Sequence, residues 1–430
     1  MAITHGMVET FHDDQLVVAL PDLKAVTGAL HRLGVRWGKT ESSPVLGLGL
    51  VSELSRVPAA VRALEQDSGP ELQRFRAERA AIRPGAPRLA DLDLLIRGIR
   101  HQLARSFPGW EVTIGKNYEP SMVKGYPHIG GGGNGDPQPA RATPGSPAAV
   151  GRRSSALGRG VGVGLLDTRI FPDERLAGHY IARPDDLLDP AKRTFTMFDG
   201  HCAFVGSCVL WHAPAAELHV RHVLNHDGNG TAWHAAVAMA ELAQAGVDVV
   251  NLSFGEYMTD DDAAPMVLEA GVKRFGPDTV VVAAAGNNGD VQNLPAELVR
   301  EGVKPNTASY PAALPDVIGV GAADEHGKRA AFTPDPAPWI TLLAPGVGLT
   351  GAYVQGKVAI EHKNRDGQTL HKKLVPFHGT AKWEGCSFAA AVVSGAIAAG
   401  TVPGRRSARE ALEQLVRKPR FGIIPNDPHT

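Results

Sequence analysis

The chain has 430 residues and an almost balanced charge, with 44 Lys and Arg, 45 Asp and Glu and a formal net charge of -1. A chain of this length is longer than those that usually fold around a single hydrophobic core, so we expect one large domain and a smaller unit. The charge balance does not favour nucleic acid or an anionic membrane surface as a partner, which leaves a protein or peptide as the expected partner.

Neither the start of the chain nor its cysteines indicate export. The first residues lack a basic stretch followed by an unbroken apolar run, and no apolar run reaches the length of a membrane span. The three cysteines, Cys202, Cys208 and Cys386, are too few for an extracellular disulfide framework, and their number is odd. The sequence therefore predicts a soluble, cytoplasmic protein.

Residues 1–118 predict a small α+β domain without obvious chemistry. Its expected elements are a strand at 15–20, a helix at 22–33, an apolar stretch at 45–54, a helix at 90–107 and a strand at 110–115. Gly and Pro dominate residues 119–158, which cannot bury much apolar surface. We predict that this segment is a flexible linker.

Residues 159–402 predict an α/β domain, because short apolar runs alternate with helical segments, as in βαβ units. Runs of Val, Ala and Leu without alternation indicate a parallel sheet with helices on both faces, a doubly wound arrangement. The predicted strands lie at 161–167, 218–224, 247–254, 279–286, 317–322 and 340–345. The clearest predicted helices lie at 231–245 and from the Asp260, Asp261 and Asp262 cluster to Gly276. Residues 403–430 predict a C-terminal helix and tail.

Four polar residues stand where these strands end or where helices begin. Asp167 ends the first strand, and Asn287 follows another strand through a glycine. His201 opens one helix, and Ser387 begins another that consists almost wholly of small and apolar residues. Functional groups in open parallel sheets gather at the carboxyl ends of the strands. Taken singly, each residue also fits a structural role as a cap, a turn residue or a core histidine.

The segments around these residues resemble, in content and order, the motifs of the subtilisin family of serine proteases. In chain order they are DTR from Asp167, HCAFVGS from His201, NLSFG from Asn251, AAGN ending at Asn287 and GCSFAA around Ser387. The order Asp, His, Ser excludes the chymotrypsin and α/β-hydrolase arrangements. The resemblance covers about residues 159–402 and implies a subtilisin-like fold for that region.

The resemblance implies a serine endopeptidase that works through an acyl-enzyme. Ser387 is the expected nucleophile, and His201 is the expected general base. Asp167 is expected to orient the imidazole, and the Asn287 amide is expected to stabilise the oxyanion together with the Ser387 backbone N–H.

The resemblance also predicts how a peptide binds. A substrate strand is expected to pair beside Ser253, Phe254 and Gly255, with Ala285 and Gly286 as further substrate-binding residues. No cofactor and no metal ligands are expected, and the sequence leaves a structural calcium ion open without indicating one.

The sequence departs from the family pattern in several places. Cys202 replaces the glycine after the histidine, Cys386 replaces the threonine before the serine, and Ala391 stands where a proline is usual. Long insertions between Asn287 and Tyr310 and between Ala352 and Trp383 lie near the expected path of the substrate. Two other functions therefore stay open: a peptide ligase or macrocyclase with the same triad, and a catalytically silent peptide-binding module.

The sequence also leaves two roles open. The N-terminal unit is either an intramolecular chaperone and inhibitor, as subtilisin propeptides are, or a permanent accessory domain. In the first case the segment from Tyr118 to Ile129 is expected to reach the active-site cleft. Cys202 and Cys386 are either small buried residues or a pair of thiols whose oxidation stops activity.

Overall fold

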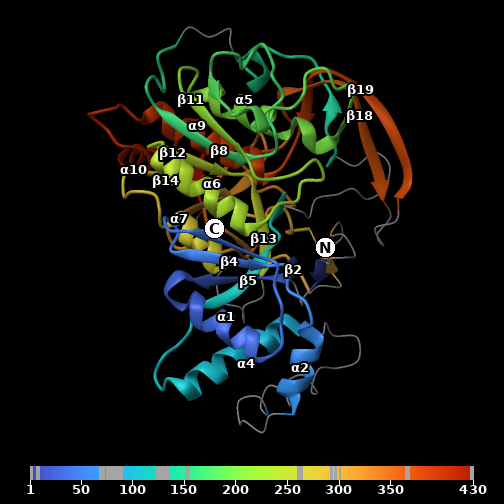
Figure 1. Ribbon diagram of the computed structural model, residues 1–430. Coiled ribbons are helices and arrows are strands. Elements are labelled where there is room, and N and C mark those ends of the chain that lie inside the picture. The colour runs from blue at the N-terminus through green and yellow to red at the C-terminus, as the bar shows by residue number, and fades with distance from the viewer. Residues whose placement is uncertain are drawn as a thin grey trace.

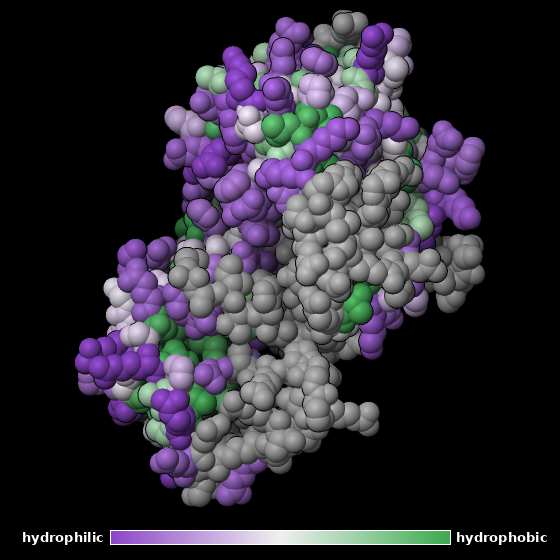
Figure 2. All heavy atoms as spheres, turned by 90° about the vertical axis from the view of Figure 1, so that its right-hand side faces the viewer, coloured by the Kyte–Doolittle hydropathy of each residue, from purple (hydrophilic) through white to green (hydrophobic). Residues whose placement is uncertain are grey.

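The computed structural model describes residues 3–5, 10–66, 73, 91–122, 135–150, 155–258, 265–290, 294, 298–299, 302–363 and 369–426. The N-terminal unit lies below the larger α/β body in Figure 1. Seen from the side, the two parts form a smaller lower mass and a larger upper mass, and hydrophilic side chains dominate the described surface of the upper one (Figure 2).

The N-terminal unit is an antiparallel sheet with helices packed against it. Its strands are β1 (Ile3–His5), β2 (Thr10–Ala19), β3 (Lys39–Ser43), β4 (Leu48–Ser52) and β5 (Ile114–Tyr118). Their order is β1-β2-β4-β3, and β5 pairs with β2. The helices are α1 (Leu23–Arg32), α2 (Val57–Glu65) and α4 (Asp91–Ser106). The predicted helices at 22–33 and 90–107 are confirmed, whereas the strand predicted at 110–115 lies later, at β5.

The large sheet has eight strands in the order β20-β17-β16-β14-β12-β8-β11-β9. They are β8 (Gly162–Asp167), β9 (Tyr180–Ile181), β11 (Glu217–His222), β12 (Val249–Leu252), β14 (Val280–Ala284), β16 (Val317–Ala323), β17 (Ile340–Pro345) and β20 (Ile424–Pro425). All pair in parallel except β20, which runs antiparallel to β17. The predicted parallel sheet is confirmed.

Helices cover both faces of this sheet. The helices α5 (His201–His212), α9 (Cys386–Gly400) and α10 (Ala408–Arg417) lie on one side, and α6 (Ala232–Gln244) and α7 (Met266–Val272) lie on the other (Figure 1). In β14, Val280 and Val282 belong to the hydrophobic core on the side of α5 and α9, and Val281 belongs to the core on the side of α6 and α7. Successive side chains of a strand point to opposite faces of the sheet. The start of the helix predicted from Asp260 lies outside the described residues.

The helices α5 and α9, which carry His201 and Ser387 in their first turns, pack closely against each other. A Cβ atom at Gly395 of α9 would lie 2.3 Å from the Val209 carbonyl oxygen of α5. Small residues in α9 permit this approach, which brings the starts of the two helices to the same edge of the sheet.

The insertion between Ala352 and Trp383 forms a long hairpin that the sequence did not predict. Its strands are β18 (Leu349–Lys363) and β19 (Thr369–Trp383), which belong to a sheet of order β10-β18-β19-β7 with β10 (Thr194–Thr196) and β7 (Gln138–Pro139). The hairpin extends away from the body at the upper right of Figure 1.

A third sheet has the order β15-β13-β6. Its strands are β6 (Ser121–Met122), β13 (Phe254–Met258) and β15 (Ala308–Tyr310). The strand predicted at 247–254 is therefore divided, because β12 belongs to the large sheet and β13 to this small one. Ser253 lies at the junction.

Much of the described part of the predicted linker is folded. Residues 121–122 form β6, residues 138–139 form β7, and Ala148 and Val150 are buried. The prediction of a free tether is wrong for these residues, because short strands gain backbone hydrogen bonds from a neighbouring strand and need few apolar side chains. Residues 123–134 and 151–154 lie outside the described residues.

The N-terminal sheet packs directly on α6 and α7 (Figure 1). The Trp233 backbone N–H donates to Asn117 Oδ1 at 3.0 Å, and Arg274 donates to the Val45 carbonyl at 2.8 Å. One hydrophobic core runs from the N-terminal unit into this face of the α/β body. Among the described residues, no helix combines the length and the apolar character needed to cross a membrane.

Candidate active site

Asp167 and His201 form a hydrogen-bonded pair in the interior. Asp167 ends β8, and His201 is the first residue of α5. His201 Nδ1 lies 2.8 and 3.0 Å from the two Asp167 carboxylate oxygens. The Thr168 backbone N–H also donates to Asp167 Oδ1, at 2.7 Å. Since the carboxylate only accepts, it holds the imidazole proton on Nδ1 and leaves Nε2 of the neutral ring as an acceptor.

Two aromatic rings enclose the His201 imidazole. Trp383 stands at 88° to it with ring centroids 5.6 Å apart, and Phe388 lies 5.3 Å away. His201 is only 1% exposed. Phe388 directly follows Ser387, so the start of α9 lies beside the imidazole.

Ser387 is 4% exposed and is hydrogen-bonded to Ser253, at the junction of β12 and β13. Its hydroxyl donates to the Ser253 carbonyl over 3.4 Å, and the Ser253 hydroxyl donates back to the Ser387 carbonyl at 3.2 Å. Asn251 Nδ2 in turn donates to Ser253 Oγ at 2.8 Å. Among the described residues, no hydrogen bond joins Ser387 to His201.

The Asn287 side chain faces the start of α9. Its Oδ1 accepts the Cys386 backbone N–H at 3.0 Å, which defines the orientation of the amide. Its Nδ2 lies 3.8 Å from the place that a Cβ atom would take at Gly385. The amide donor therefore lies next to the backbone that leads into Ser387.

Residues 120–122 already occupy the strand position predicted for a substrate. In β6, Met122 pairs with Phe254 and Ser121 with Gly255. On the other edge of β6, Met122 N–H donates to the Gly228 carbonyl at 2.7 Å. Two of the three predicted substrate-pairing residues, Phe254 and Gly255, thus pair with the chain itself.

The two remaining predicted substrate residues, Ala285 and Gly286, have different surroundings. Gly286 lies beside Tyr257, at the end of β14. Ala285 is buried, its N–H donates to the Val320 carbonyl, and its own carbonyl accepts the Trp339 indole N–H. Both backbone groups of Ala285 are therefore used inside the fold.

Cys202 and Cys386 are free, buried thiols with different neighbours. Burial and the nearby Asp167 carboxylate raise the pKa of Cys202 well above its usual value. Burial raises the pKa of Cys386 to about 11, and its Sγ lies 3.6 Å from Thr333 Oγ1. Both thiols therefore stay protonated at neutral pH, which makes them poorly reactive.

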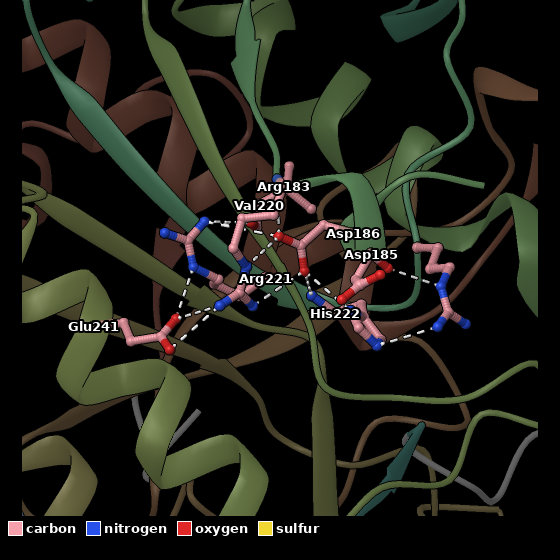
Figure 3. Close-up of polar contacts among 8 residues, drawn as sticks. Arg183, Asp185, Asp186, Val220, Arg221, His222 and Glu241 are labelled. Atoms are coloured by element: carbon pink, nitrogen blue, oxygen red, sulfur yellow. Dashed lines mark hydrogen bonds and ion pairs between the residues drawn. The ribbon is translucent and has the colours of Figure 1, made fainter. Parts of the chain in front are cut away.

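A cluster of polar side chains gathers around the buried Asp186 (Figure 3). Asp186 is fully buried and accepts from the His222 backbone N–H at 2.9 Å, from His222 Nδ1 at 3.0 Å and from Arg183 Nε at 2.9 Å. These hydrogen bonds, with His222 and Arg183, hold the pKa of Asp186 well below its usual range despite burial. His222 is the register partner of Asp167.

Arg169 stands in this cluster where the family motif has a glycine. Its Nε donates to the Asp185 carbonyl at 2.8 Å, and its guanidinium lies 3.4 Å from His222 Nε2. The sequence does not predict the contacts of Arg183, Asp186 and His222, since no motif brings their three segments together. Within the described ranges, no group of three or more His, Cys, Asp or Glu side chains could hold a metal ion.

Comparison with known proteins identifies the family. Residues 158–402 match the model of the subtilase family, peptidase S8, so the chain belongs to that family of serine proteases. Subtilisin BL from Lederbergia lenta is 31% identical over 216 residues, which cover 48% of this chain and 71% of that protein. Subtilisin DY from Bacillus licheniformis is 36% identical over 146 residues, which cover 34% of this chain and 47% of that protein.

The likeness to solved structures concerns the fold. Fervidolysin from Fervidobacterium pennivorans, a keratinolytic enzyme related to subtilisin, superposes with a TM-score of 0.52 at 14% identity over 90% of this chain and 54% of that one. The chain spans between 32% and 50% of the length of three matched relatives, subtilisin DY among them.

Proposed function

We propose that this chain is a serine endopeptidase that cleaves peptide bonds through an acyl-enzyme on Ser387. One observation carries the proposal. A peptide strand, β6, lies along β13 and ends one residue short of the position opposite Ser253, whose carbonyl accepts the Ser387 hydroxyl. A substrate strand in the same place brings its backbone to this hydroxyl.

In this mechanism His201 is the general base. Its Nδ1–H is held by Asp167, so Nε2 can take the proton of Ser387 Oγ while this oxygen attacks the substrate carbonyl carbon. His201 then gives the proton to the leaving amine, and a water molecule releases the acyl group by the same route. Asp167 stabilises the imidazolium that forms in between.

The developing oxyanion would be held by two donors. One is the Asn287 side-chain amide, and the other is the Ser387 backbone N–H in the first turn of α9. The positive end of that helix favours the negative charge further. The Asn287 amide is already held by the Cys386 N–H, so it needs little reorganisation during the reaction.

The proposal gives the N-terminal unit the role of an intramolecular inhibitor. The strand that follows this unit, β6, lies between β13 and the segment at Gly228 to Gly230, and Gly230 N–H donates to the Pro120 carbonyl at 2.9 Å. Substrate cannot pair with β13 until β6 leaves. The part of the expected inhibitory segment beyond Met122 lies outside the described residues.

A fluorophosphonate probe tests the catalytic assignment. Labelling of Ser387 in the wild-type chain, and none in Ser387→Ala, supports an activated serine. Absence of labelling after the N-terminal unit has been removed would favour the silent peptide-binding module. Product analysis with a peptide and an added amine separates hydrolysis from ligation, since a ligase yields mainly the amide product.

A further inference from the structure

We propose that the pocket for the substrate residue before the scissile bond is shallow and accepts only small side chains, with Tyr257 and Ser309 as its floor. This inference rests on the proposed function and names the substrate class of the same site.

The register of β6 defines which substrate residue enters this pocket. Met122 stands opposite Phe254 in an antiparallel pair. A substrate strand in the place of β6 therefore has its next residue opposite Ser253. Because the Ser253 carbonyl accepts the Ser387 hydroxyl, this residue carries the carbonyl group that Ser387 attacks.

Strand geometry defines where the side chain of that residue points. Opposed residues of antiparallel strands point to the same face, and alternate residues of one strand share a face. The substrate side chain opposite Ser253 therefore shares its face with Gly255 and Tyr257 of β13. Ser309 of β15 joins them, since it is the register partner of Tyr257.

The space beside Gly255 is already partly filled. A Cβ atom at Gly255 would lie only 2.3 Å from Ser309 Oγ, so this hydroxyl takes the volume that a side chain there would need. Ser309 is 1% exposed, and its hydroxyl has no hydrogen-bond partner within the described part of the chain. The hydroxyl thus forms a polar floor under the glycine.

Tyr257 closes the pocket further along the same face. Its hydroxyl oxygen accepts the Asn287 backbone N–H at 3.2 Å, and its Cε1 lies 3.3 Å from the place of a Cβ atom at Gly286. The ring therefore spans the gap between β13 and the end of β14. It is held from behind by apolar residues of the first insertion, Leu294, Leu298 and Val303.

Gly255 and Gly286 line this pocket without side chains, and the Ser309 hydroxyl and the Tyr257 ring limit its depth. The pocket therefore has room only for a short side chain. Alanine, serine or valine fits above Gly255, whereas leucine, phenylalanine or lysine meets the Ser309 hydroxyl or the Tyr257 ring. In the sequence, Met122 is followed by Val123, a residue of the size that this pocket takes.

Peptides that differ only in the residue before the cut test the pocket. The full-length chain is incubated until active, and fluorophosphonate titration counts its active sites. We expect kcat/KM for alanine and valine to exceed the values for leucine and phenylalanine by at least about tenfold.

Two variants should widen the selectivity. Tyr257→Ala is expected to reduce the preference for alanine over phenylalanine at least about tenfold. Because truncation of a buried tyrosine can prevent folding, Ser309→Gly is the second variant, and it should shift the ratio of leucine to alanine about fourfold towards leucine. Tyr310→Phe is the matched control, since Tyr310 points to the opposite face of β15, and its ratios should stay at the wild-type values.

The outcomes separate the two proposals. Equal cleavage after alanine and phenylalanine by a wild-type chain that needs Ser387 overturns the shallow pocket and leaves the proposed function standing. Wild-type ratios in a folded Ser309→Gly chain and in a folded Tyr257→Ala chain overturn it as well. If no peptide is cleaved and Ser387 is not labelled, the proposed function fails, and the pocket fails with it.

Discussion

The indole of Trp383 stands at right angles to the imidazole of His201, and its Nε1–H donates to the Gly135 carbonyl at 2.9 Å. Trp383 is the last residue of β19, which also pairs with β7. The hairpin and the segment after the N-terminal unit thus meet at the ring that covers the candidate base. This contact restricts how the imidazole can turn.

Removal of the indole should therefore affect both stability and turnover. For Trp383→Ala we expect a loss of about 3 to 5 kcal/mol in the free energy of unfolding. We also expect a fall in kcat without a matching rise in KM, because the imidazole loses a restraint. Trp383→Phe keeps an aromatic ring and should lose less. Denaturant unfolding and peptide kinetics measure these effects, and a folded Trp383→Ala chain with normal kcat would contradict them.

Ser387→Ala, His201→Ala and Asp167→Asn should each abolish most turnover. The proposed mechanism uses the three side chains as one unit, so the double variants should be scarcely slower than the single ones. Circular dichroism and the unfolding midpoint check that each variant keeps its fold. Cleavage by Ser387→Ala at the wild-type rate would refute the assignment of the nucleophile.

Loss of the Asn287 amide donor should lower kcat by about 10² to 10³ with little change in KM, a magnitude taken from an equivalent donor in subtilisin. Asn287→Ala also leaves the Cys386 N–H without its acceptor, so its stability should fall too. Asn287→Asp retains an acceptor oxygen for that N–H and isolates the loss of the donor. A change in KM alone would make Asn287 a binding residue.

Asp186 should make the protein more sensitive to acid. Its pKa is lowered in the folded state by its hydrogen bonds to His222 and Arg183, so it stabilises the fold above the unfolded pKa of about 3.9. That contribution is lost as the pH falls below this value towards the folded pKa. Asp186→Asn should therefore be less stable at pH 7, and its stability should change less between pH 5 and pH 2. Urea unfolding across this range gives the test, with Asp185→Asn as the control, since only the backbone carbonyl of Asp185 contacts Arg169.

The position of β6 predicts self-processing soon after Met122. The wild-type chain should be cut within residues 123–134, and Ser387→Ala should stay intact under the same conditions. Intact-mass spectrometry locates the cut. Added N-terminal fragment should then inhibit the processed chain. If residues 135–430 are fully active and are not inhibited by this fragment, the N-terminal unit is an accessory domain.

The sequence predicted the large sheet well because its strands are buried on both faces. A continuous apolar run such as Val280 to Ala284 is typical of a parallel strand that is covered on both faces. The Asp167 and His201 pair was also predicted, since a motif places each at the end of an element. The inward position of Ala285 was not predicted, because a shift of one residue along a strand moves a side chain to the other face of the sheet.

The hairpin and β6 could not be predicted for a different reason. Strand β18 pairs with β19 and β10, and β6 is a two-residue strand in a Gly- and Pro-rich segment. Both depend on partners far away in the chain, which local patterns do not encode. The cluster around Asp186 has the same origin, since Arg183 and His222 come from separate segments.

β13 has a neighbour on each side only while β6 is in place. When β6 leaves, one side of β13 becomes an open strand edge with unpaired N–H and C=O groups, which other chains can join. The same edge that admits a substrate can then pair with a strand of a second copy. By occupying it, residues 121–122 would protect the newly made protein from aggregation as well as from premature cleavage, and a chain without them should aggregate more readily at high concentration.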